Sequence, residues 1–78
     1  MNVKARFKCI EIRHIHGASP GGVLAELKFM AAYNDGKGNE DWSKWTPSGE
    51  IKMMVTNPAA IAAFDLGKEY ELTFSPVE

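Results

Sequence analysis

The strongest constraint on the fold is an alternation of apolar and polar residues near the start of the chain. From Val3 to Cys9 every second residue is apolar, and each residue between them is a lysine or an arginine. Successive side chains of a β-strand point to opposite faces, so this pattern indicates a strand with one buried face. The phase reverses at Ile10. We expect a β-bulge near Cys9–Ile10 that returns Ile10 and Ile12 to the core; the alternative leaves both on the outer face.

Three later segments repeat this alternation, and we expect strands over residues 23–33, 50–55 and 69–74. In the first of these, alternate residues from Val23 to Tyr33 would share the core face. Residues 42–46 are expected to form a further short strand. The polar, glycine-rich stretch 34–41 is expected to be a flexible loop, and glycine and proline favour turns at 17–22 and 47–49.

Asn57 and Pro58 mark the start of a short helix. Asparagine is favoured at the N-cap, and proline is tolerated at the first helical position because its missing N–H needs no partner there. The alanine-rich residues that follow place Ala60, Ile61 and Phe64 on one stripe. A helix of about two turns is not stable alone, so we expect this stripe to pack against the rest of the protein.

The expected order is therefore β-β-(β)-β-α-β, with the short 42–46 strand in brackets. We expect one domain, residues 1–78, that is mainly β with one short helix: a small curled antiparallel sheet or a partly open barrel. An oligonucleotide-binding barrel also carries a helix late in its chain, but it has two strands after that helix and this chain has room for one.

Two charged rows lie on the outer faces of the first and last strands. Lys4, Arg6 and Lys8 form a basic row, and Glu69 and Glu71 form an acidic one. The basic row could follow a phosphate backbone. We prefer the interpretation that the two strands pair antiparallel, because the opposite charges would then face each other and stabilise the pair.

Composition and motifs exclude several classes of function. A formal net charge of −1 argues against a strongly basic nucleic-acid binder, and a single cysteine, Cys9, excludes an internal disulfide. No apolar stretch is long enough to span a membrane, and no signal peptide is evident, so a cytoplasmic location is expected. The chain has no Ser-His-Asp spacing, glycine-rich phosphate loop, HExxH or CxxC motif.

Metal binding is also not expected. His14 and His16 would point the same way from a strand, but a zinc site needs at least a third ligand. The oxygen-rich loop 34–41 lacks the order of ligands found in calcium loops. Cys9 alternates with core residues, and a buried cysteine is usually inert. We therefore expect a protein that is not an enzyme and that has no cofactor and no metal site.

Aromatic residues beside the 34–41 loop are the first candidates for binding. Aromatic side chains next to a polar loop can stack on a base or anchor a protein interface, and they can equally fill a small core. The residues of this candidate ligand or partner site are Tyr33, Trp42, Lys44 and Trp45.

Apolar residues on the outer faces of two strands are the second candidate. Leu24, Met30 and Ala32 alternate with the core residues of the second strand, and Met54 does so in a later one. If these strands are neighbours, Leu24, Met30 and Met54 would form an exposed apolar patch of the kind that marks an interface. The alternative is that the helix stripe covers them.

Three stretches of the chain, together with the alternating start from Val3 to Cys9, resemble small proteins encoded by tailed bacteriophages and prophages. These stretches are WTPSGEIKM at 45–53, TNPAA at 56–60 and GKEYELTFSP at 67–76. The resemblance extends over nearly the whole chain. It implies a phage product acting in a bacterial cytoplasm, and it implies no catalytic residues, because those proteins have no known function.

These features together predict a small, non-enzymatic binding protein, in this setting a phage accessory protein. It would act through a protein or oligomer interface, with a homo-oligomer or a protein partner as the expected assembly and no membrane partner. The alternative is a barrel that binds single-stranded nucleic acid or a nucleotide-like ligand through the aromatic site.

Overall fold

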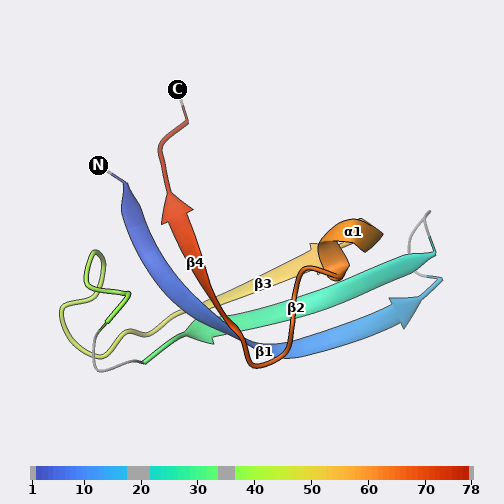
Figure 1. The fold of residues 1–78 in the computed structure, drawn as a ribbon, viewed down its shortest axis with the longest axis horizontal. Helices are drawn as coiled ribbons and strands as arrows, with labels where there is room; N and C mark the ends of the chain where they lie inside the picture. Colours follow the sequence, from blue (N-terminus) through green and yellow to red (C-terminus); the bar gives the residue numbers. More distant parts are fainter. Residues whose placement is uncertain (1, 18–21, 34–36, 78) are drawn as a thin grey trace.

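A computed structural model describes residues 2–17, 22–33 and 37–77, and it contains one antiparallel sheet and one short helix (Figure 1). The strands pair in the order β3-β2-β1-β4. Within the described residues β3 and β4 pair with no further strand, so the sheet is curled and not closed. This confirms the predicted mainly β class. The elements are β1 (Val3–His16), β2 (Val23–Ala31), β3 (Glu50–Val55), α1 (Pro58–Ile61) and β4 (Glu69–Phe74).

The bend of the sheet lies in β1. Residues 3–8 of this strand pair with β4, and residues 7–16 pair with β2. The register with β2 shifts between Cys9 and Glu11, which confirms the predicted bulge. Figure 1 shows β1 curving there, so that its first half and β4 turn away from β2 and β3. After the bulge Ile12 lies opposite Leu27 and packs against the core, as predicted. The prediction is wrong for Ile10, which is the inserted residue and stays exposed.

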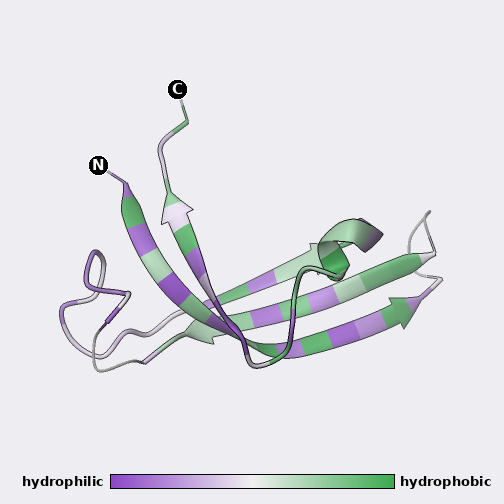
Figure 2. Ribbon diagram, viewed as in Figure 1, coloured by the Kyte–Doolittle hydropathy of each residue, from purple (hydrophilic) through white to green (hydrophobic). Residues whose placement is uncertain are grey.

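The core forms on one face of the sheet, where the alternation predicted it. Figure 2 shows the alternating hydrophobic and hydrophilic bands along the strands. The buried residues of the cluster are Ala5, Phe7, Cys9, Ala25, Leu27, Phe29 and Val55.

Helix α1 begins as predicted and is held by aromatic contacts after its end. The Asn57 side chain accepts a hydrogen bond from the backbone N–H of Ala59 at 3.1 Å. Phe64 packs edge-on against Phe29, with ring centroids 5.6 Å apart, and Tyr70 contacts both rings. Such ring pairs stabilise beyond their buried area. The helix stripe thus packs on the core face and does not cover the outer face of the sheet.

Two local predictions are wrong. Residues 42–46 form turns and bends, because the N–H groups of Trp42 and Ser43 both donate to the Asn39 carbonyl and leave no ladder to build. Strand β2 ends at Ala31, so the alternation stops there. Ala32, predicted on the outer face, is buried, and Tyr33, predicted on the core face, is exposed.

The predicted facing of the two charged rows is confirmed. In the β1–β4 register Arg6 lies opposite Glu71, and Lys8 lies opposite Glu69. The Arg6 Nε atom is also 3.9 Å from Glu69 Oε1, on the diagonal. These pairs are exposed, so each stabilises the strand pairing only slightly, but together they offset two of the three positive charges of the basic row.

The Tyr70 hydroxyl provides a test of this packing. It donates to the Ala63 carbonyl at 3.3 Å and accepts from the Asp65 N–H at 2.8 Å. We expect Tyr70→Phe to lower the free energy of unfolding by about 1 kcal/mol, because the ring contacts remain and only the hydrogen bonds are lost. Urea unfolding measures this. The matched control is Tyr33→Phe, whose hydroxyl is exposed; an equal loss in both variants would contradict the assignment.

Candidate functional site

Asn39 is the buried polar side chain of the described residues, with 1% of its surface exposed. Its Oδ1 atom accepts from the Arg6 N–H at 2.7 Å and from Trp42 Nε1 at 2.7 Å. Its Nδ2 group donates to the carbonyls of Arg6 at 3.1 Å and Ala32 at 2.8 Å. Both donors and both lone pairs of the amide are therefore used. The side chain pairs with β1 as the backbone of a neighbouring strand would.

The segment around Asn39 is fixed to the edge of β1 by two further features. The Asp41 carboxylate accepts from the Lys4 N–H at 2.9 Å. Gly38 has a φ of 93°, and a Cβ there would lie 3.0 Å from the Arg6 side chain, so this position needs glycine. The prediction of a flexible loop is thus wrong for residues 38–41, and residues 34–36 lie outside the described residues. Two side-chain oxygens of this oxygen-rich stretch, Asn39 Oδ1 and Asp41 Oδ2, accept hydrogen bonds from the backbone of β1.

Trp42 is held by both its ring and its N–H. The hydrogen bond to Asn39 fixes the indole, which stacks on Phe7 with ring centroids 6.0 Å apart and planes 11° from parallel. Phe7 is buried, while one face of Trp42 stays accessible. Trp42 therefore closes the core at this end and also presents a rigid aromatic surface.

A shallow apolar groove of about 420 Å³ lies beside Trp42, and we call it the Trp42 groove. Ile51 of β3 and Phe74 of β4 both line it, although these strands are opposite edges of the sheet. The bend of β1 accounts for this approach. Phe74 is 55% exposed. The lining residues are Val3, Ala5, Phe7, Trp42, Gly49, Glu50, Ile51 and Phe74.

Of the predicted aromatic site, only Trp42 is among the residues that line the Trp42 groove. Trp42 lies in the groove, whereas Trp45 is 82% exposed and Tyr33 is also exposed, and neither makes a ring contact in the described part of the chain. Lys44 is exposed between the two tryptophans in sequence. Asn39, Asp41 and Phe74 were not among the predicted site residues. No local pattern signals the role of Asn39, because its partner Arg6 lies 33 residues away in the sequence.

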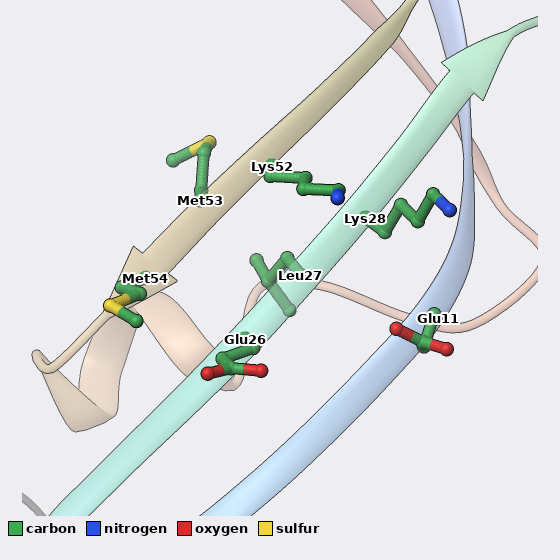
Figure 3. A pocket seen from close by; sticks show the side chains of 7 residues that line it. All are labelled: Glu11, Glu26, Leu27, Lys28, Lys52, Met53 and Met54. Atoms are coloured by element: carbon green, nitrogen blue, oxygen red, sulfur yellow. The ribbon is translucent and has the colours of Figure 1, made fainter.

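The predicted apolar patch is interrupted by charges. Met30 and Met54 are exposed and Leu24 is half-buried. On the outer face of β2, Glu26 and Lys28 separate Leu24 from Met30. Figure 3 shows the neighbouring hollow of about 290 Å³, which is lined by Glu11, Glu26, Leu27, Lys28, Lys52, Met53 and Met54.

The titratable groups offer no metal centre. Among residues 2–17, 22–33 and 37–77, no three His, Cys, Asp or Glu side chains are placed to hold a metal ion. Burial raises the pKa of the Cys9 thiol above its ordinary value of 9.0, and the charge of Asp65 acts in the same direction, while a hydrogen bond with the backbone of Glu11 opposes them. The thiol is fully buried, so it is a core group.

Comparison with known proteins adds no relative. No protein-family model matches the chain, and neither the curated proteins nor the solved structures contain a match. In the described residues, no helix has the length and apolar character needed to cross a membrane.

Asn39 can be tested by truncation. We expect Asn39→Ala to lower the free energy of unfolding by about 3 kcal/mol, because buried N–H and C=O groups lose their partners. It should also weaken the near-ultraviolet circular dichroism, because the Trp42 ring is released. The control Asn57→Ala removes an exposed helix cap and should cost about 1 kcal/mol. Urea unfolding that gave the same loss for both variants would contradict the role of Asn39.

The raised pKa of Cys9 predicts a pH dependence. The folded state disfavours the thiolate, so the stability from this group is present below the ordinary pKa of the unfolded state and is lost as the pH rises above that value. Between neutral pH and about pH 10, we expect the unfolding free energy of Cys9→Ala to decrease less than that of the natural protein. Urea unfolding of both proteins at each pH measures this, and the difference between them removes the contributions of the other titrating groups. Parallel pH profiles would contradict the assignment.

Proposed function

We propose that this protein is a non-enzymatic interaction protein that binds an apolar segment of a partner protein in the Trp42 groove. The observation that carries the proposal is the lining of the groove: the partly exposed rings of Trp42 and Phe74 line it together with the buried Phe7. Exposed, contiguous apolar surface on a small protein commonly marks an interface.

The rigidity of the groove supports this proposal. Asn39 fixes Trp42 before any partner arrives, so little side-chain freedom is lost on binding. Tryptophan is also enriched among the residues that dominate binding energy at interfaces. The volume of about 420 Å³ is large enough for a few apolar side chains of a partner.

The charges around the groove favour an apolar ligand over a phosphate. Glu50 is the charged residue in its lining. The carboxylate of Glu50 is 3.6 Å from the Nζ atoms of both Lys28 and Lys52, so it is neutralised on the outer side. No lysine or arginine lines the groove. In the setting that the phage resemblance implies, the partner would be a protein of the bacterial cytoplasm and this chain an accessory protein.

Nucleic-acid binding is the second candidate. The exposed rings of Tyr33 and Trp45, with Lys44, favour it, because exposed aromatics beside a cation can stack on bases. These residues lie outside the lining of the Trp42 groove. The two functions therefore depend on different side chains and can be separated by substitution.

Paired substitutions test the proposal. The natural protein, Phe74→Ser and Trp45→Ser serve as baits in bacterial lysate, and the retained proteins are quantified by mass spectrometry. We expect the natural chain and Trp45→Ser to retain the same partner protein in similar amounts. Phe74→Ser should retain about tenfold less of this partner, because a half-exposed ring at an interface contributes about 1–2 kcal/mol to binding.

A fluorescence titration separates the alternative. We expect the tryptophan emission of the natural protein to be unchanged by a thymidine oligonucleotide at low salt. Two results together would overturn the proposed function in favour of nucleic-acid binding. The oligonucleotide would quench the emission of the natural protein but not that of Trp45→Ser, and no lysate protein would be retained in a way that depends on Phe74.

A further inference from the structure

The outer edge of β3 presents backbone groups that are paired with no strand in the described part of the chain. The Ala31 N–H donates to the Gly49 carbonyl, so the pair Ala31–Gly49 is hydrogen-bonded. Because such pairs alternate along an antiparallel ladder, Ile51, Met53 and Val55 bond to β2. The N–H and C=O groups of Glu50, Lys52 and Met54 consequently point outward. Such an edge is a template for another strand.

The edge of β4 and the edge of β1 beside Cys9 carry features that protect them. On β4, a second copy that paired with its two-fold axis at Tyr70 would bring Glu69 and Glu71 opposite each other. On β1 the N–H and C=O of Cys9 already bond to Lys68 and Gly67, and the bulge twists the strand next to them. Charges and bulges are the usual means of protecting an edge.

Strand β3 lacks these devices. It contains no proline and no register shift, and its single lysine is 3.6 Å from the carboxylate of Glu50. Met53 is exposed and Met54 is 69% exposed. Figure 3 shows Met53 projecting from the side of β3 that faces away from β2. Methionine packs adaptably, so this edge offers apolar contacts as well as hydrogen bonds.

We propose that β3 pairs antiparallel with β3 of a second copy of this chain, with the two-fold axis at Met53. In this register Met53 lies opposite its own copy, and Ile51 lies opposite Val55 of the second copy on the core face. On the outer face, Lys52 lies opposite Met54 of the second copy. Each facing pair on the core side is apolar, and no like charges are directly opposed.

Neighbouring registers are less favourable. Residues that face each other must share a face of the sheet, so the axis can move only by whole residues along β3. An axis at Lys52 would oppose the two lysines, which repel. An axis at Met54 would bring Pro58, which has no N–H, into the ladder. The chain's net charge of −1 adds little general repulsion between copies. The proposal goes beyond the Trp42 groove and does not depend on it.

Cysteine cross-linking tests the register. Residue 53 would be a non-hydrogen-bonded pair of the new ladder, where side chains are closest, so Met53→Cys should form an intermolecular disulfide under mild oxidation. The control Thr73→Cys places an exposed thiol on β4. We expect the first variant to cross-link about tenfold faster, because pairing raises the local thiol concentration. Equal rates would overturn the proposal.

Sedimentation equilibrium tests the assembly itself. We expect a dimer of the natural protein and a monomer of Met54→Pro, since this change removes an N–H that points outward and bonds to no strand within the copy. Far-ultraviolet circular dichroism shows whether Met54→Pro is folded. If it is not folded, the cross-linking rates of Met53→Cys and Thr73→Cys decide whether the dimer forms. A natural protein that stays monomeric at millimolar concentration would overturn the dimer, while protein binding that depends on Phe74 would leave the proposed function standing.

Discussion

The hydrogen bonds of the Asn39 side chain hold the first half of β1 along the side that faces away from β4, just beyond the end of β2. Strand β2 ends at Ala31; the C=O of Arg6 still accepts from the Ala32 N–H, but the N–H of Arg6 would face this gap without a partner. The amide of Asn39 bonds both groups, and with the same oxygen it fixes Trp42 over Phe7. An unpaired buried polar group is costly, so these bonds, with those of Asp41, hold residues 38–42 against β1.

The bend of β1 then determines what the surface can do. A flat sheet of this strand order would keep its edge strands far apart, with β2 and β1 between them. The bulge after Cys9 turns the β1–β4 pair, and Phe74 and Ile51 come to line one groove with Trp42. Short curled sheets with an incomplete core leave apolar surface uncovered, and here that surface lies where the bend and the Asn39 segment meet.

Much of the fold was predictable because one face of the sheet is buried. A strict period of two defines the core residues of each strand, and the phase reversal at Ile10 located the bulge. The site was less predictable, because it depends on contacts between distant segments. Asn39 reads as a loop residue in the sequence, and only its position 33 residues from Arg6, across the end of β2, makes it part of the sheet. Local patterns carry no signal for a bond of this range.

The groove and the outer edge of β3 share one strand, and this has a consequence for how the two proposals relate. Ile51 lines the groove through its side chain and bonds to β2 through its backbone, while its neighbours Glu50 and Lys52 direct their backbone groups outward. Pairing of β3 with a second copy would make β3 an internal strand and restrict its motion. A groove wall that is already ordered binds with less loss of entropy, so a dimer would hold its partner more tightly than a monomer with identical contacts.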